Sequence, residues 1–116
     1  MGQDIEALQT ALREFARERE WEPFHSPKNL AAALSVEAAE LLEHFQWLTE
    51  AQSRELSGDK RGKVAEELAD VLIYVLQLAD KLDIDPVDAA WRKMEANGRK
   101  YPVERAKGRI TKYTEL

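Results

Sequence analysis

The sequence predicts an all-α fold, and three observations lead to this prediction. Apolar residues recur at three- and four-residue intervals through most of the chain, which is the period of an α-helix. Of the 116 residues, 44% are hydrophobic and 34% are charged, and only five are Gly and four Pro, as is typical of soluble helical proteins. No stretch alternates apolar and polar residues as a half-buried strand does. We therefore expect one all-α domain over residues 1–116, with a basic C-terminal tail over about 99–116.

Four helices are predicted by their start and stop signals. Asp4, Ser26 and Asp85 are residue types that cap helix N-termini, and the last two each precede a proline, which suits the first helical position. Gly98 is a typical residue just past a helix end. The predicted helices cover residues 5–19, 27–49, 63–82 and 87–98, with a polar connection over 50–62.

The third predicted helix carries the longest apolar stripe. Its members are Val64, Leu68, Val71, Leu72, Val75, Ala79 and Leu82. Because such stripes bury themselves against neighbouring helices, we expect all seven to face the core of a helical bundle.

Charge and cysteine content exclude several classes of protein. The net charge is −5, and residues 1–91 hold nine Lys and Arg against nineteen Asp and Glu, whereas residues 92–116 hold eight against three. An acidic body argues against general nucleic-acid binding, and the absence of cysteine excludes disulfides and thiolate zinc sites. No basic start, apolar leader or membrane-length apolar run is present, so a cytoplasmic protein without membrane contact is expected.

Two pairs of carboxylates are the strongest chemical signal. Glu37 and Glu40 lie three residues apart on the second predicted helix, and Glu67 and Asp70 have the same spacing on the third. Each pair projects to one side of its helix, so two adjacent helices can converge all four acids. Hard divalent cations such as Mg²⁺ prefer oxygen ligands, whereas four converging carboxylates repel one another without a cation. The alternative from spacing alone is that both pairs lie on solvated faces.

Aromatic residues near these acids allow two interpretations. Trp21 and His25 lie in a segment interrupted by two prolines, and Trp47 follows the first acid pair. A tryptophan near a helix end most often packs in a core or an interface, but an aromatic face also stacks on a nucleobase. Either histidine taken alone, His25 or His44, is more often structural or at the surface than a ligand.

A family resemblance covers nearly the whole chain. Glu37-Ala-Ala-Glu40 followed by Glu67-Leu-Ala-Asp70 resembles the signature of the MazG-like superfamily of all-α nucleoside triphosphate pyrophosphohydrolases. The surrounding motifs are similar to those of its dCTP pyrophosphatase branch. They are Trp21-Glu-Pro-Phe24-His25, Phe45-Gln46-Trp47, Asp70-Val-Leu-Ile-Tyr74, Lys93-Met94-x-x-Asn97, Lys100-Tyr101-Pro102 and Lys112-Tyr113-Thr114-Glu115-Leu116.

The resemblance implies hydrolysis of a (deoxy)nucleoside triphosphate, dCTP or a modified dCTP, to the monophosphate and pyrophosphate, which would serve nucleotide-pool sanitation. It implies Mg²⁺, with Mn²⁺ as an alternative, and a homotetramer, a dimer of dimers in which subunit pairing completes four-helix bundles. The implied metal ligands are Glu37, Glu40, Glu67 and Asp70. The implied substrate-binding residues are Trp21, His25, Trp47, Tyr74, Lys93, Asn97, Lys100 and Tyr101. The general base is left open between the four acids and Glu43.

One position departs from the family pattern, because Leu12 stands where animal members carry a histidine near the base, so base preference stays open. Two alternatives of other classes also remain. The first is a non-catalytic helical module that binds a nucleotide or a partner through the aromatic segment and the basic tail. The second is a purely structural oligomerisation bundle.

Overall fold

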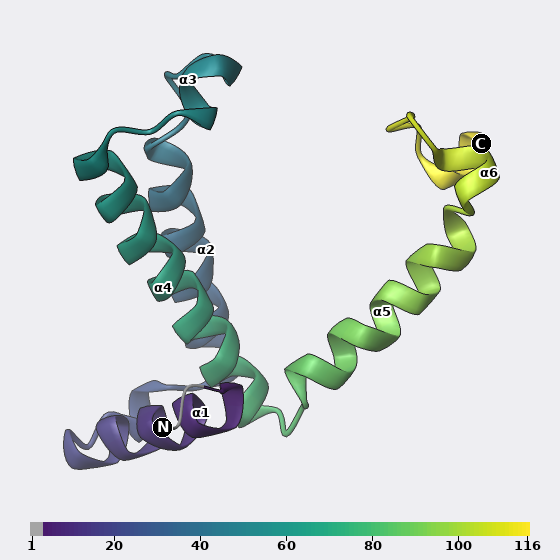
Figure 1. Ribbon diagram of the computed structural model, residues 1–116. Helices are drawn as coiled ribbons and strands as arrows, with labels where there is room; N and C mark the ends of the chain where they lie inside the picture. Colours follow the sequence, from purple (N-terminus) through teal and green to yellow (C-terminus); the bar gives the residue numbers. More distant parts are fainter. Residues whose placement is uncertain (1–3) are drawn as a thin grey trace. The chain divides into compact units, whose positions relative to one another are not determined.

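The computed structural model describes residues 4–116, and every regular element in that range is helical (Figure 1). The elements are α1 (Ile5–Glu18), η1 (Glu22–Phe24), α2 (Pro27–Glu43), α3 (Glu50–Arg54), α4 (Gly58–Lys81), α5 (Pro86–Lys100), α6 (Val103–Ala106) and η2 (Tyr113–Glu115). The all-α prediction is therefore confirmed. None of the helices in residues 4–116 combines the length and the apolar character needed to cross a membrane.

Internal contacts divide the chain into two compact units. Unit 1 extends to Asp83 and contains α1, η1, α2, α3 and α4, whereas unit 2 begins at Ile84 and contains α5, α6 and η2. A single domain over residues 1–116 stays a prediction.

The predicted N-caps are confirmed. The Asp4 carboxylate accepts a hydrogen bond of 2.8 Å from the Ala7 amide, and the Ser26 hydroxyl accepts one of 3.1 Å from the Asn29 amide. Asp85 accepts two bonds, from the amides that follow Pro86. Each cap satisfies amide groups that the first turn of a helix leaves unpaired, which fixes where α1, α2 and α5 begin.

Three predicted helix boundaries are wrong. Helix α2 ends at Glu43 rather than 49, with His44 as its C-cap, and Thr49 forms a capping box with Gln52 that starts α3. Helix α4 begins at Gly58 rather than 63, because the Ser57 hydroxyl caps it. Helix α5 ends at Lys100 rather than 98, since Gly98 keeps a helical backbone. Among the glycines in residues 4–116, it is Gly108 that adopts a positive φ, of 76°.

The basic C-terminal tail is folded onto the end of α5. The ring of Tyr113, in this tail, lies edge-on to the ring of Tyr101, and the two ring centroids are 5.9 Å apart. The Lys100 ammonium nitrogen stands 4.8 Å from the centroid of the same Tyr113 ring, within range of a cation–π contact. The tail thus has defined local structure inside unit 2.

Helix α4 is the central element of unit 1. It packs along α2 and also contacts α1, which crosses its C-terminal part (Figure 1). The buried apolar side chains come from all three helices: Ala16 from α1, Leu30 from α2, and Val64, Leu76 and Ala79 from α4. Burial of each leucine stabilises the fold by roughly 1.5–3 kcal/mol.

Much of the rest of the apolar stripe on α4 is left exposed by the described elements of unit 1. Leu68, Leu72 and Val75 are 53%, 43% and 37% exposed, and Leu82 is also exposed. That these four face the core of a helical bundle stays a prediction, since the predicted bundle is completed by subunit pairing. Within unit 1, α4 packs against α2 and α1.

Candidate active site

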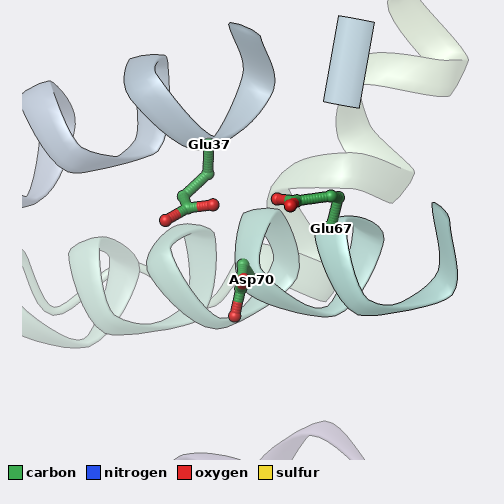
Figure 2. Close-up of side chains that lie close together, drawn as sticks. All are labelled: Glu37, Glu67 and Asp70. Carbon is green, nitrogen blue, oxygen red and sulfur yellow. The ribbon is translucent and has the colours of Figure 1, made fainter. Parts of the chain in front are cut away.

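Helices α2 and α4 bring three of the four predicted metal ligands together. Glu37, Glu67 and Asp70 each offer a carboxylate oxygen, and these oxygens all lie within 4.8 Å of one another. Figure 2 shows Glu37 extending from α2 toward the adjacent helix, α4, which carries Glu67 and Asp70. The geometry follows from local structure, since residues three apart on α4 share a face and α2 packs along that helix.

Glu40, the fourth predicted ligand, lies one turn beyond Glu37 on α2 and is half-buried. It is not part of the closest group of three oxygens, but it lies close enough to Glu37 to help raise the pKa of that carboxyl. The structure therefore brings three of the four acids together, and a role for Glu40 as a ligand stays a prediction.

The electrostatics of this cluster are unfavourable for an isolated protein. The pKa of Glu37 is raised to about 7, first because burial disfavours its ionised form, and then because of Glu40, Glu67 and Asp70 beside it. One buried oxygen of Glu37 and one of Glu67, both Oε2, have no hydrogen-bond partner among the described residues. Buried polar atoms nearly always have a partner, so this cluster is arranged for a group that the chain itself does not supply.

A divalent cation fits that arrangement. The donors are all carboxylate oxygens, which are the ligands that hard cations take, and two of them are buried without a partner. A cation would satisfy both orphaned oxygens and remove the mutual repulsion that raises the pKa of Glu37.

The predicted aromatic residues of unit 1 occupy two different places. Trp21 and His25 flank η1, and their ring centroids lie 6.4 Å apart. The side-chain amide of Asn29 donates a 3.0 Å hydrogen bond to the Phe24 carbonyl, which fixes this turn. Trp47, in the turn after α2, is 86% exposed. Tyr74 lies one turn beyond Asp70 on α4 and is half-buried. Trp47 therefore offers an uncovered aromatic face, as base stacking requires.

The other predicted substrate-binding residues belong to unit 2. Lys93 and Asn97 are one turn apart on α5 and exposed, Lys100 ends that helix, and Tyr101 is its C-cap. Lys100 and Tyr101 contact Tyr113 as described above. A role for these four residues beside the acids of unit 1 stays a prediction.

Sequence reasoning missed a pocket of about 190 Å³ between α1, η1 and α4. Part of its wall is an ion pair in which Arg13 donates two hydrogen bonds, of 2.7 and 2.8 Å, to Asp80. These residues are 67 positions apart, so no local pattern connects them. One signal was available: Gln77, another lining residue, follows Asp70 by seven positions and so shares its face of α4.

Fold and site together define a helical protein with a carboxylate centre suited to a divalent cation. The chain belongs to the MazG-like family, whose family profile matches residues 32–116. The predicted resemblance is therefore confirmed.

Similar proteins include dCTP pyrophosphatase 1 of Homo sapiens and of Mus musculus, which are 43% and 42% identical over 114 residues. In both cases the match covers 97% of this chain and 67% of the relative. Among solved structures, a pyrophosphatase from Archaeoglobus fulgidus is 50% identical with a TM-score of 0.80, over 84% of this chain and 92% of the other.

Proposed function

We propose that this protein hydrolyses deoxynucleoside triphosphates, dCTP or modified dCTP among them, to the monophosphate and pyrophosphate with the help of Mg²⁺ or Mn²⁺. The enzyme class, a nucleoside triphosphate pyrophosphohydrolase, is confirmed by the family and by relatives named as pyrophosphatases. The choice of base is supported by the names of the mammalian relatives, which specify dCTP.

The observation that carries the proposal is the pair of buried, unpartnered carboxylate oxygens on Glu37 and Glu67. Glu37, Glu40, Glu67 and Asp70 would hold the cation. A bound divalent cation supplies charge neutralisation for the triphosphate and for the leaving pyrophosphate, and it acidifies water. A solvated pair of acids would have its oxygens in water, and these two oxygens are buried.

The predicted substrate-binding residues of both units would position the nucleotide. Trp47 and Tyr74 offer aromatic surfaces to the base, and Trp21 and His25 do so from η1. Lys93 and Asn97 would contact phosphate or sugar, with Lys100 and Tyr101 assisting. The base that takes the proton from the attacking water is one of the four acids or Glu43, the last residue of α2.

A homotetramer built from paired subunits belongs to the same proposal. The support is the apolar stripe of Leu68, Leu72 and Val75, which lies exposed on the helix that carries Glu67 and Asp70. Exposed contiguous apolar surface is expected to pair, and a second copy of the chain has the same stripe to offer. Light scattering coupled to size-exclusion chromatography should give four times the 13.3 kDa chain mass. A monomer at micromolar concentration contradicts this part of the proposal.

Phosphorus-31 NMR of a dCTP digest tests the reaction. Pyrophosphate and dCMP appearing together in equal amounts support cleavage between the α and β phosphorus atoms. Orthophosphate with dCDP refutes it. A tight, Mg²⁺-dependent complex that leaves dCTP intact for hours would instead identify a non-catalytic nucleotide-binding module.

A further inference from the structure

Lys63 lies on the face of α4 that carries the acids. It precedes Glu67 by four residues and Asp70 by seven, so at about 100° per residue its direction from the helix axis falls between those of the two acids. Its side chain is exposed, and within residues 4–116 its ammonium group forms no ion pair. Lys63 is therefore an uncommitted cation one turn away from the acid cluster.

His44 has the same relation to the acids of α2. It follows Glu40 by four residues and Glu37 by seven. Although His44 is the C-cap, its backbone is still helical, with φ of −71° and ψ of −17°. Its direction from the axis of α2 therefore also falls between those of two acids, and its ring is half-buried.

These two residues lie at the same end of the helix pair. Helices α2 and α4 pack side by side and run in opposite directions, so the last turn of α2 lies beside the first turns of α4 (Figure 1). His44 belongs to the former and Lys63 to the latter. Lys60, seven residues before Glu67, adds a second lysine on that face of α4. We call this the basic end of the site, defined by His44, Lys60 and Lys63.

Helix geometry directs these groups and the acids toward each other. The Cα–Cβ bonds of an α-helix tilt toward its N-terminus. The side chain of His44 therefore leans back toward Glu40, while on α4 the acids lean toward the turn that holds Lys63. The rise from Lys63 to Glu67 is only about 6 Å, a distance that a long lysine side chain and a phosphate group can bridge together.

The other side of the acids has a different character on α4. Tyr74 follows Asp70 by four residues and is half-buried. From its N-terminal end, this face of α4 is thus basic, then acidic, then aromatic. A nucleoside triphosphate whose α phosphate lies at the acids has its outer phosphates on one side and its base on the other. The order along α4 therefore directs the outer phosphates toward Lys63 and the base toward Tyr74.

The groups at the basic end also suit the chemistry of the outer phosphates. A lysine ammonium carries three donors, and an imidazole donates an N–H in either protonation state. Hydrogen bonds from charged donors to phosphate are stronger than those between neutral groups. When the bond between the α phosphorus and the bridging oxygen breaks, negative charge gathers on the departing pyrophosphate, so donors placed there act where charge develops.

We propose that Lys63 and His44 contact the β and γ phosphates of the bound nucleotide, which are the part that leaves as pyrophosphate. The proposal rests on the proposed function and adds two substrate-binding residues to it. Under it, the basic end distinguishes triphosphates from monophosphates.

Binding to the full-length protein with Mg²⁺, measured by isothermal titration calorimetry, gives the first test. The probes are dCMP and α,β-imido-dCTP, in which an NH group replaces the oxygen between the α and β phosphorus atoms and prevents cleavage there. In Lys63→Ala, affinity for the analogue should fall by about tenfold, whereas affinity for dCMP should stay within about twofold. An equal change for both ligands overturns the proposal, since Lys63 would then lie away from the outer phosphates, as it would if the base stacked on Trp47.

Arg61→Ala is the matched control. Arg61 is exposed and lies two residues before Lys63, about 200° around α4, so its loss removes the same charge from another face of the same helix end. Both affinities should stay within about twofold. If Arg61→Ala weakens the analogue as much as Lys63→Ala does, a long-range effect of charge explains both losses and the proposal fails. Lys63→Arg keeps a cation and should restore most of the affinity for the analogue.

His44→Leu tests the second residue, because leucine removes the donor and keeps an apolar side chain in a half-buried position. Affinity for the analogue should fall by about threefold or more, again without a change for dCMP. Unchanged affinity for the analogue overturns the role of His44.

These measurements use no turnover, so they are separate from the test of hydrolysis. If the wild-type protein binds the analogue no more tightly than dCMP, the basic end makes no contact with the outer phosphates, whether or not dCTP is hydrolysed. Tighter binding of the analogue that depends on Lys63, in a protein that releases no pyrophosphate from dCTP, refutes the proposed reaction and supports the phosphate contacts.

Discussion

The Asp80 carboxylate on α4 and the carboxylate cluster shared by α2 and α4 contrast sharply in how their oxygens are satisfied. Both oxygens of Asp80 accept hydrogen bonds from the Arg13 guanidinium, whereas the cluster of Glu37, Glu67 and Asp70 has two buried oxygens without partners. The pKa values move in opposite directions: Arg13 lowers that of Asp80, and burial beside other acids raises that of Glu37. A carboxylate satisfied by its own chain holds helices together, whereas one left unsatisfied marks the place for an external ligand.

Among the changes predicted below, Glu67→Gln in the unsatisfied cluster should have the largest effect, which falls on hydrolysis. The amide removes a negative charge that a cation needs, so hydrolysis of dCTP should fall by more than about 100-fold. The stabilisation by Mg²⁺ in thermal unfolding should be lost as well, because a ligand raises stability only if it binds the folded state. The control is Glu66→Gln, the exposed neighbour on α4. Wild-type activity in the Glu67 variant would show that this residue is not a ligand.

The stability contributed by Glu37 and the stability contributed by Asp80 should change with pH in opposite directions. Glu37 has its pKa raised from 4.5 to about 7, so between these values the folded protein keeps a proton that the unfolded chain has released. In EDTA, the free energy of unfolding contributed by Glu37 should therefore fall as pH rises from about 4.5 to 7 and then level off. Asp80, whose pKa is lowered, contributes stability above the ordinary Asp range and loses it as pH falls.

Urea unfolding of the wild type and of Glu37→Gln across this pH range checks the sign. The variant should lack the fall, and excess Mg²⁺ should reverse it in the wild type, because the cation binds the ionised carboxylates. A wild-type curve that does not change between pH 4.5 and 7 would contradict the raised pKa of Glu37.

The variant Glu20→Gly lies outside both the acid cluster and the Arg13–Asp80 pair, and it should change stability without changing activity. Glu20 follows α1 with a φ of 54°, a left-handed conformation that costs an ordinary residue about 1 kcal/mol relative to Gly. Glu20→Gly should therefore raise the free energy of unfolding by up to about 1 kcal/mol without altering turnover. Chemical denaturation and a dCTP assay measure the two quantities, and a loss of activity would show that the end of α1 does more than lead into η1.

The smallest effect is expected from breaking the satisfied pair. Its side chains are partly exposed, at 54% for Arg13 and 27% for Asp80, and exposed ion pairs contribute little to stability. Asp80→Asn and Arg13→Gln should each lower the urea midpoint slightly. In a double-mutant cycle the two changes together should cost less than the separate losses combined, because they remove one shared interaction. Additive losses would mean that the pair contributes nothing.

How much the sequence predicts depends on whether the information is local. Asp4, Ser26 and Asp85 cap their helices as predicted, because a cap depends on a few neighbouring residues. The acids were also found from sequence, since the spacing of three residues places Glu67 and Asp70 on one face.

Features that depend on distant residues were not predictable in this way. Periodicity identified the apolar stripe on α4 but could not show that the described elements of unit 1 leave Leu68 and Leu72 exposed. No local pattern connects Arg13 to Asp80, so the sequence did not predict the pocket that these two residues line. At 44–49 the apolar pattern continues, but α2 ends at Glu43 and Thr49 caps a separate helix, α3.

Helix α4 carries Glu67, Asp70, Tyr74, Gln77 and Asp80 within one uninterrupted element that extends from Gly58 to Lys81. Insertion of a single residue between Asp70 and Gln77 would rotate everything beyond it by about 100° relative to the acids and shift it by about 1.5 Å. The segment between the caps Thr49 and Ser57 is not subject to that constraint, since each cap starts a helix of its own. Homologous enzymes can therefore differ in the length of that segment, whereas the spacing of the acids along α4 should be fixed to the residue.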